Sequence, residues 1–291
     1  MSAFQAEDKG SIPLSRTLKA MSPNYKINIP KEVEIVIQTL KNAGFEAFLV
    51  GGCVRDMIMG RIPKDWDVTT NAKPEQIISL FEKTVYENTF GTVGVCIPKL
   101  ETLNPKLENI EYEIIEVTPY RLEGKYTDSR HPDSVSFSEN ILDDLKRRDF
   151  TMNSIAFCPD FSQIEKFYKG QKSLGECGEL VDPYNGIKDI DEKFIRTVGE
   201  ADDRFGEDAL RMLRAIRFSC ELGFTISKET LDGVIHSHEK ISQISKERIR
   251  DEFEKIIMSK EPALGVGMLQ KLGLIKYFIP ELEEGDRKSV V

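Results

Sequence analysis

The chain has 291 residues, of which 40% are hydrophobic and 31% charged, a balance that is typical of a folded globular protein and argues against disorder over most of its length. Its formal net charge of -9 argues against general binding to nucleic acids, which requires positive charge, although basic residues cluster locally at 146–148. Because no stretch approaches the length of an apolar membrane span and the N-terminus lacks the apolar core of a signal peptide, we expect no membrane association and a cytoplasmic location.

The N-terminal part of the chain predicts an arm, a helix and a strand. Residues 1–29 mix Ser, Pro, Lys and Gly without a hydrophobic period, so we expect a partly ordered arm. From Lys31 to Ala43, apolar residues recur at helical spacing, and the glycine that follows predicts the end of the helix. Phe45 to Val50 is a short apolar run, which predicts a buried strand.

A glycine pair and two aspartates follow that strand. Gly51 and Gly52 predict a turn whose backbone amides are free to hold phosphate oxygens. Asp65 and Asp67 precede the strand formers 68–70, and the two-residue period of a strand would place both carboxylates on one face. Adjacent carboxylates repel each other unless a cation lies between them, and Mg²⁺ favours one or two carboxylates with phosphate oxygens. We therefore predict a phosphate cradle beside a metal site, the alternative for an isolated DxD being a surface turn.

The next segment predicts a helix, two strands and a long loop. Residues 74–81 have helical spacing, whereas 93–97 and 112–117 have the character of strands. Glu116, on the second of these strands, is a candidate third carboxylate that assists the aspartate pair; the alternative is an edge-strand glutamate facing water. Residues 121–137 contain Gly, Pro and Ser with many charges, which predicts a mobile loop, either a lid or a plain solvated loop.

A charged block at residues 143–157 begins as a polar helix and ends in a strand. Within it, the guanidinium group of Arg148 suits triphosphate or ribose oxygens, and Asp149 is able to accept a hydrogen bond from a ribose hydroxyl. Taken alone, such a block is usually a surface salt-bridge cluster. Beyond Arg196, helical patterns replace strand patterns.

Residues 205–222 predict one amphipathic helix. Asp208 and Arg211 lie one turn apart, opposite a buried face. The predicted buried residues are Ala209, Leu213, Ile216 and Cys220. Without further context, the simplest hypothesis for Asp208 and Arg211 is an ordinary i,i+3 salt bridge, which contributes a few tenths of a kcal/mol.

Several spaced motifs together resemble the family of CCA-adding tRNA nucleotidyltransferases of bacteria and eukaryotes and bacterial poly(A) polymerases. GGCVRDMIMGRIPKDWD at 51–67 resembles the first motif of that family, and RRDFTMNSIA at 147–156 resembles the second. DPYNG at 182–186 is similar to its short linker motif, EDALR at 207–211 to its nucleotide-selecting motif, and residues 244–257 to its last motif. The resemblance implies an α+β fold, with a nucleotidyltransferase head that contains a mixed sheet and flanking helices, followed by an all-helical neck.

The resemblance also implies domains and site residues. We expect an arm at 1–29, a catalytic head at 30–160 and a helical neck at 161–291. The implied catalytic residues are Asp65 and Asp67, which would bind Mg²⁺, and Glu116, which would assist them. The implied nucleotide-binding residues are Gly51, Gly52, Arg55, Arg148, Asp149, Asn153, Asp208, Arg211, Arg214 and Arg217.

By this resemblance, the protein would transfer nucleotides from CTP and ATP to the 3′ hydroxyl of tRNA. An aspartate acceptor beside an arginine donor pairs with C or A and leaves unpaired groups against U or G, as the selecting motif requires. Addition of A alone and poly(A) polymerase activity are alternatives, and a non-catalytic RNA-binding module is an alternative of a different class. Family members normally continue into further helical regions, so we expect this chain to be a truncated or naturally short form.

Overall fold

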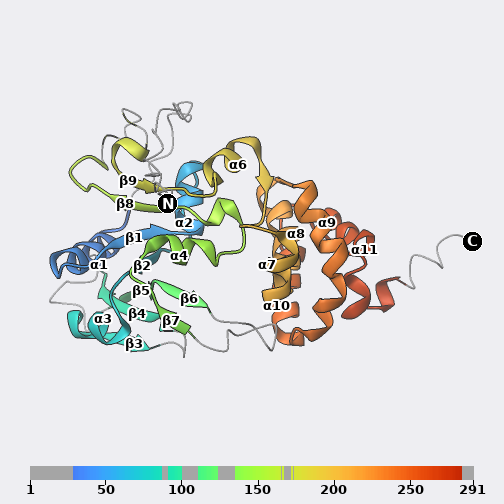
Figure 1. Cartoon of the computed structure of the whole chain (residues 1–291), viewed down its shortest axis with the longest axis horizontal. Coiled ribbons are helices and arrows are strands. Elements are labelled where there is room, and N and C mark those ends of the chain that lie inside the picture. Colours follow the sequence, from blue (N-terminus) through green and yellow to red (C-terminus); the bar gives the residue numbers. More distant parts are fainter. Residues whose placement is uncertain are drawn as a thin grey trace, which may run out of the picture.

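The structure is a computed structural model that describes residues 29–86, 91–99, 111–123, 135–164, 166, 172 and 174–283. Figure 1 shows two lobes: an α/β lobe that contains the sheet, here called the head (29–192), and a helical lobe, here called the neck (193–283). The predicted arm lies outside the described residues except for Ile29, which is buried in the core. No helix of the described part is long and apolar enough to cross a membrane.

The head contains a seven-stranded mixed sheet in the order β3-β4-β5-β2-β1-β8-β9. Its strands are β1 (Ala47–Val50), β2 (Asp67–Thr70), β3 (Thr84–Tyr86), β4 (Val93–Pro98), β5 (Tyr112–Pro119), β8 (Ala156–Pro159) and β9 (Gly178–Val181). Among these pairs β2 and β5 are parallel and the others antiparallel, so the predicted mixed sheet is confirmed. Because β9 belongs to this sheet, the sheet continues beyond residue 160, where we predicted the head to end.

Helices α1 (Lys31–Asn42) and α3 (Pro74–Leu80) pack against the sheet and contribute to the main core. The helical spacing predicted from the sequence is confirmed in α1, where the apolar positions are fully buried. These positions are Val33, Val36, Ile37 and Leu40. Helix α2 (Gly52–Ile58) follows β1 directly through the predicted glycine turn.

The short helix α4 (Ile141–Lys146) packs over part of the sheet. It inserts Leu145 into a second apolar cluster with Phe48 and Val50 of β1 and Ala156 of β8. On β5, side chains at alternate positions stay exposed, and Ile114 is 53% accessible. Hence α4 covers the β1 and β8 part of this face and leaves β5 open beside β2.

Two strands form within the segment for which we predicted a loop. β6 (Arg121–Glu123) and β7 (Val135–Phe137) pair antiparallel at the two ends of the segment for which we predicted a mobile loop. That prediction was wrong for the ends, because Leu122 and Ser136 pair across the two strands. Residues 124–134, between them, lie outside the described part.

The neck is built around α8, which contacts α7, α10 and α11. Its helices are α7 (Ala201–Glu207), α8 (Leu210–Leu222), α9 (Lys228–Ser237), α10 (Lys246–Ile257) and α11 (Pro262–Lys271), with 3-10 helices η4 (His238–Gln243) and η5 (Ile275–Tyr277). A short parallel pair, β10 (Phe194–Ile195) and β11 (Thr225–Ile226), is the exception to an otherwise helical neck. The four apolar positions predicted for the buried face are all buried.

The predicted single helix over 205–222 is wrong at Asp208. There the backbone is extended, with φ -148 and ψ 104, so α7 ends at Glu207 and α8 begins at Leu210. The break turns the Asp208 carboxylate back onto its own chain, where it accepts a hydrogen bond from the backbone N–H of Leu210 at 3.1 Å. Apolar periodicity alone did not reveal this break, because the spacing continues through it.

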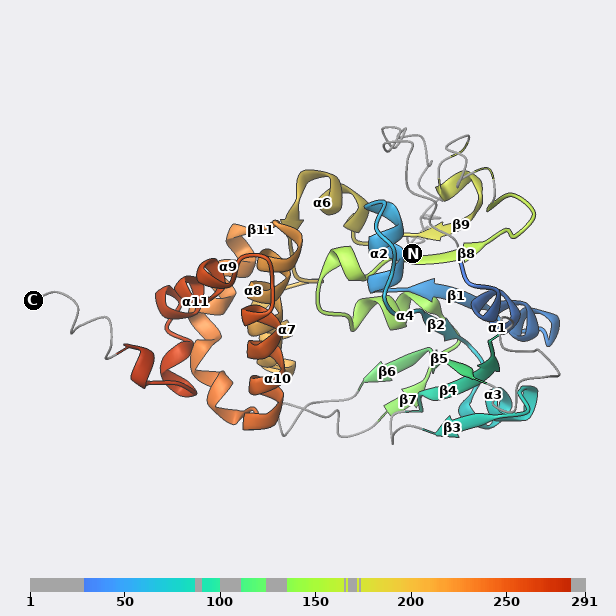
Figure 2. The same ribbon diagram turned by 180° about the vertical axis from the view of Figure 1, so that it is seen from behind.

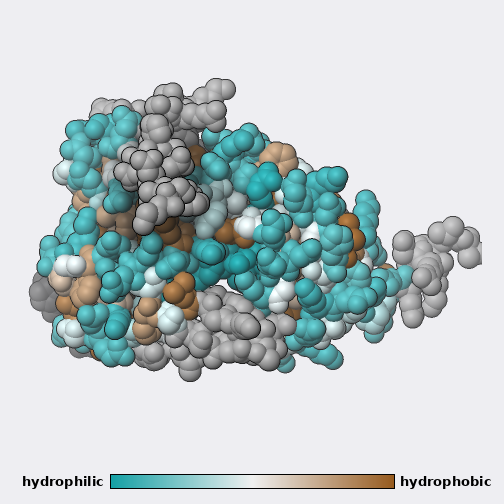
Figure 3. All heavy atoms as spheres, in the orientation of Figure 1, coloured by the Kyte–Doolittle hydropathy of each residue, from teal (hydrophilic) through white to brown (hydrophobic). Residues whose placement is uncertain are grey.

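One apolar core continues from head to neck. Phe150 of the head meets Phe218 of α8 edge to face, with ring centroids 5.8 Å apart. Backbone hydrogen bonds from Thr151 to Arg196 (2.9 Å) and from Val198 to Asp149 (3.1 Å) join the same two lobes. As the reverse view shows, α6 (Gly186–Glu192) lies where the chain passes from head to neck (Figure 2). Among the described residues on the face seen in Figure 3, hydrophilic ones predominate.

Candidate active site

Gly51 forms the turn between β1 and α2, and its backbone requires glycine. Its φ is 79 and its ψ is -132, a conformation that residues with a Cβ rarely adopt. A Cβ at this position would lie 3.1 Å from Nη1 of Arg148 and 3.8 Å from Oδ2 of Asp67. A guanidinium group and a carboxylate that interact with each other therefore lie beside the turn, on the side that a Cβ would occupy. A Cβ on Gly52, the first residue of α2, would make only an ordinary contact, 3.6 Å from Nη2 of Arg55.

Asp67 and Glu116 are direct neighbours across the sheet. Asp67 is the first residue of β2, and it pairs in parallel register with Glu116 of β5. Residues that pair in this way direct their side chains to the same face of a sheet. This face is the one that β5 leaves open, because Glu116 belongs to its exposed alternation. Two of the three predicted catalytic carboxylates are thus side by side.

Asp65 lies in a bend before β2, so the prediction that both aspartates share one strand was wrong. The strand begins only at Asp67 because β1, its neighbour, ends at Val50 and the chain then turns away at Gly51. Asp65 is nevertheless close enough to Asp67 for their charges to interact. Burial raises the pKa of Asp67, the guanidinium group of Arg148 opposes this change, and the negative charge of Asp65 adds to it.

The described residues include no group of three or more His, Cys, Asp or Glu side chains arranged to hold a metal ion. The site therefore offers a pair of neighbouring acids at residues 65 and 67, with Glu116 beside the second.

Arg148 is fixed by a buried acid that we did not predict. Asp144, on α4, is fully buried and accepts a hydrogen bond from Nη2 of Arg148 at 2.9 Å and one from Nε of Arg147 at 2.9 Å. Burial opposes ionisation of Asp144, but the two guanidinium groups outweigh it and lower the pKa of this acid. The i,i+3 and i,i+4 spacing to the two arginines is the signal in the sequence that would have identified Asp144.

Asp149 joins the head to the neck. Its Oδ2 accepts hydrogen bonds from Nε of Arg214 at 2.8 Å and forms an ion pair with Nη2 at 2.7 Å, whereas Oδ1 accepts from the backbone of Phe150 and from Nδ2 of Asn153. Burial raises the pKa of Asp149, but the positive charge of Arg214, and secondarily of Arg211, outweighs burial and lowers it to about 2. A ribose hydroxyl, which we predicted as its partner, would need to displace one of these groups.

Three guanidinium groups lie around the ring of Phe218, a residue that no sequence motif selected. Arg55, Arg214 and Arg217 lie 5.3, 5.5 and 4.4 Å from the ring centroid. Arg55 also donates a hydrogen bond from Nη1 to Oδ1 of Asn153 at 2.9 Å. Helix α2 is therefore linked through Arg55 to both Asn153 and Phe218.

Glu252 of α10 is the acid behind these arginines. It is 4% exposed, lies 3.0 Å from Nε of Arg217 and 3.6 Å from Nη1 of Arg214, and supports both. Burial lowers the pKa of Arg217, a change that Glu252 opposes. The i,i+4 spacing of Glu252 from Arg248 is visible in the sequence. The contact of Glu252 with α8 is a tertiary contact, which sequence spacing does not reveal.

Asp208 and Arg211 are here called the base-reading pair after the role that the sequence resemblance implies for them. Their side chains bind other residues and not each other. Asp208 accepts from Nη2 of Arg248 at 2.7 Å and from Nη1 at 3.3 Å. Arg211 donates to Glu207 at 2.7 Å and to the carbonyl oxygen of Arg147 at 3.1 Å. The simple i,i+3 salt bridge is therefore not what these two residues form.

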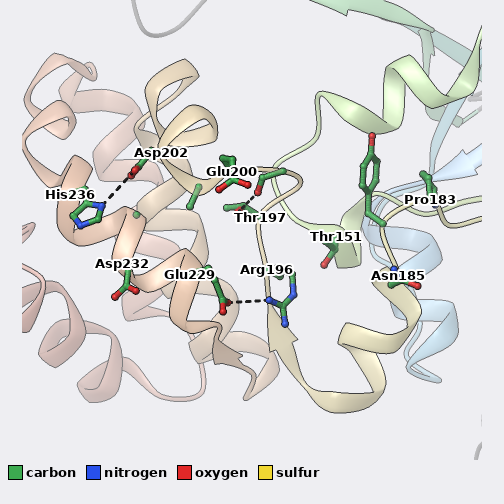
Figure 4. A pocket seen from close by; sticks show the side chains of 14 residues that line it. Thr151, Pro183, Asn185, Arg196, Thr197, Glu200, Asp202, Glu229, Asp232 and His236 are labelled. Atoms are coloured by element: carbon green, nitrogen blue, oxygen red, sulfur yellow. Dashed lines mark hydrogen bonds and ion pairs between the residues drawn. The ribbon is translucent and has the colours of Figure 1, made fainter.

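A separate cavity of about 470 Å³ lies where the chain passes from head to neck. In Figure 4, Thr151, Pro183 and Asn185 lie on its head side, and Asp202, Asp232 and His236 lie on its neck side. Arg196 bridges towards Glu229 at 3.1 Å. None of the predicted site residues lines this cavity, and Glu116 of the candidate active site is exposed on β5.

With its mixed sheet, paired acids and helical neck, the molecule has the features of a nucleotidyltransferase head and neck. Residues 47–196 match the family described as poly A polymerase head domain, and residues 223–285 match one described as probable RNA and SrmB-binding site of polymerase A. Because the first match spans half of the chain, the protein belongs to the poly A polymerase head domain family.

Within that family, the chain is similar to CCA-adding enzymes. It is 40% identical over 227 residues to the CCA-adding enzyme of Lactobacillus delbrueckii subsp. bulgaricus, covering 78% of this chain and 50% of that enzyme. It is 38% identical over 252 residues to the CCA-adding enzyme of Geobacillus thermodenitrificans, covering 86% and 55%. The crystal structure of Bacillus stearothermophilus CCA-adding enzyme in complex with CTP matches with a TM-score of 0.68 and 35% identity, covering 85% and 53%. The chain therefore spans about half the length of the curated relatives it matches.

Proposed function

We propose that this chain is a template-independent RNA nucleotidyltransferase that adds CCA to the 3′ end of tRNA, using CTP, ATP and Mg²⁺. The similarity to CCA-adding enzymes supports this substrate class, and the similar structure that contains CTP supports a nucleoside triphosphate as the donor.

One observation carries the proposal: the parallel register of Asp67 and Glu116 directly beside the Gly51 turn. Nucleotidyl transfer needs acids near the attacking hydroxyl and positive charge near the phosphates. The acids lie on the open face of the sheet, and a Cβ on Gly51 would lie 3.1 Å from Nη1 of Arg148 and 3.8 Å from Oδ2 of Asp67. A triphosphate placed along this turn would therefore lie near both groups.

We propose that Asp65 and Asp67 hold Mg²⁺ and that Glu116 assists them. The donor set fits this ion, since Mg²⁺ takes one or two carboxylates together with phosphate oxygens and water. The charge interaction between the two aspartates also fits, because a cation between them would relieve it. When bound, Mg²⁺ would supply charge neutralisation at the phosphates and activation of the 3′ hydroxyl.

We predicted free backbone amides at Gly51 and Gly52, but the N–H of Gly51 donates to the carbonyl oxygen of Ile155 at 3.3 Å. We therefore propose that Gly52 and Arg148 hold the triphosphate, that the turn at Gly51 lets it approach, and that Arg55 supports them from α2. The base-reading pair has donors and acceptors left for a nucleotide. Of the five N–H groups of Arg211, three reach protein acceptors in the described part of the chain, which leaves the Nε group and one Nη2 group. Oδ2 of Asp208 accepts only from Arg248 there, which leaves it able to accept an exocyclic amine.

Incorporation of labelled nucleotides tests the function. The chain is incubated with Mg²⁺, each labelled NTP in turn, and tRNAs that end before the first C, after CC, or with complete CCA. We expect C to be added to the first substrate, A to the second, and nothing to the third.

The other functions give different results in the same assay. Addition of A to the CC substrate without addition of C indicates an A-adding enzyme, and long A tracts on any 3′ end indicate a poly(A) polymerase. Retained RNA binding without incorporation indicates a non-catalytic module and contradicts the proposal.

A further inference from the structure

Arg204, on α7, contacts both members of the base-reading pair through its backbone. Its carbonyl oxygen accepts a hydrogen bond from the backbone N–H of Asp208 at 3.3 Å and one from Nη1 of Arg211 at 3.4 Å. Nothing in the sequence motifs selected Arg204 as a site residue. Its position in the last turn of α7 therefore links it to both residues.

The side chain of Arg204 reaches Arg211 through a shared acid. Nη2 of Arg204 lies 2.6 Å from Oε1 of Glu207, and Oε2 of Glu207 lies 2.7 Å from Nη1 of Arg211. One carboxylate thus binds a different guanidinium group with each oxygen. The arginine side chains are only 14% and 11% exposed, so water screens these ion pairs less than it would at a free surface.

The same two arginines bind the end of a head helix. Nη1 of Arg204 donates to the carbonyl oxygen of Lys146 at 3.1 Å, and Nη2 of Arg211 donates to that of Arg147 at 3.1 Å. Lys146 is the last residue of α4, where carbonyl groups lack partners within the helix and cations are favoured. Hence Arg204 is held at three points, by Glu207, by α4 and by its own backbone contacts.

From this geometry we infer that Arg204 is a positioning residue for nucleotide selection, an inference that rests on the proposed function. Arg204 occupies one oxygen of Glu207, so Arg211 receives only the other. Without Arg204, both oxygens of Glu207 are free to bind Arg211 in the bidentate geometry that carboxylates and guanidinium groups favour. That geometry draws Nη2 of Arg211 away from Arg147 and turns the donors that would face the base.

Binding of the four NTPs to the whole chain tests the inference. Isothermal calorimetry gives the Kd of CTP, ATP, UTP and GTP for the wild type, Arg204→Ala, Arg204→Lys and Arg211→Ala, and circular dichroism checks that each variant is folded. We expect Arg204→Ala to reduce the preference for CTP over UTP roughly three- to tenfold. Lysine has a single ammonium group in place of the planar guanidinium group, so we expect Arg204→Lys to retain only part of the wild-type preference.

A double variant separates positioning from a general structural role. If Arg204 acts through Arg211, adding Arg204→Ala to Arg211→Ala changes the preference no further, whereas independent effects add. Arg250→Ala is the matched control, because Arg250 is an exposed arginine of α10 that pairs with Asp251. It should leave the preference at the wild-type value.

The inference is overturned if Arg211→Ala alters the preference and a folded Arg204→Ala does not, or if the two effects add. A wild-type chain that binds all four NTPs equally overturns the base-reading pair and this inference together. Selective binding without incorporation contradicts the proposed nucleotidyl transfer but not the inference about Arg204, because the ratios of the Kd values still test the role of Arg204.

Discussion

Arg248 of α10 donates hydrogen bonds from Nη1 and Nη2 to the two carboxylate oxygens of Asp208, which lies 40 residues earlier in the chain. This contact fixes an acid at the break between two helices, and in the described part of the chain Oδ2 accepts a hydrogen bond from Arg248 alone. An acid that is held in this way suits recognition of an amine better than a mobile surface aspartate does.

Asp208→Ala should reduce the preference for CTP and ATP over UTP and GTP by roughly ten- to a hundredfold, because it removes the acceptor of the exocyclic amine. The measurement is kcat/KM for all four NTPs on tRNA substrates. Asp251→Ala is the control, since Asp251 is an exposed acid on α10. An unchanged preference in Asp208→Ala would assign this residue a structural role only.

Asp67→Asn should lower nucleotide incorporation by at least about a hundredfold while the fold is retained, because the substitution keeps the shape and removes the charge that a metal requires. Incorporation is measured over a Mg²⁺ titration, and circular dichroism monitors the fold. The exposed Asp160 supplies the control, as Asp160→Asn. Wild-type rates in Asp67→Asn at every Mg²⁺ concentration would contradict the assigned metal ligand.

Gly51→Ala should destabilise the protein by about 1–3 kcal/mol, because a Cβ is strained at a φ of 79 and approaches Arg148. It should also impair incorporation, since the turn is the proposed phosphate cradle. Gly267→Ala is the control: a Cβ there meets nothing within 4 Å, and alanine favours the helix. Urea unfolding and incorporation are measured for both, and equal stability of the two variants would contradict the strain argument.

Asp149 should make folding sensitive to acid. Its pKa is about 2 in the folded protein, below its usual value of 3.8, so its stabilising contribution is complete above about pH 4 and is lost as the pH falls through about 2. The contribution is about 2 kcal/mol, at 1.36 kcal/mol for each pKa unit. Urea unfolding of the wild type and Asp149→Asn between pH 5 and 2 measures it. A variant with the wild-type slope would show that Asp149 does not titrate in this way.

Local periodicity predicted much of the fold. The apolar spacing of α1 and of the buried face of α8 was visible in the sequence, because the period of the helix decides which of its side chains face the core. The strand predicted at 112–117, which carries Glu116, likewise forms most of β5. These features depend on neighbours within a few residues.

Tertiary contacts account for what could not be predicted. Asp149 was expected to face a ribose, but it is enclosed by Arg214, which is 65 residues away. The helix break occurs at Asp208, the residue that binds Arg248 of α10, and apolar periodicity gave no sign of it. Sequence patterns identified the charged residues, whereas their pairing depends on how head and neck pack.

The order of strands in the sheet has a consequence for synthesis of the chain. β1 lies near the middle of the sheet, yet β8, its partner on one side, ends only at Pro159. At a synthesis rate of about 5–20 residues per second, roughly 5–20 s pass between the synthesis of β1 and that of β8, and β1 is unpaired on this side during that time. During that time the nascent chain exposes an unpaired hydrophobic strand, a form of edge that promotes aggregation. Slower translation would lengthen this exposure, and a chaperone that binds short apolar segments would shorten it.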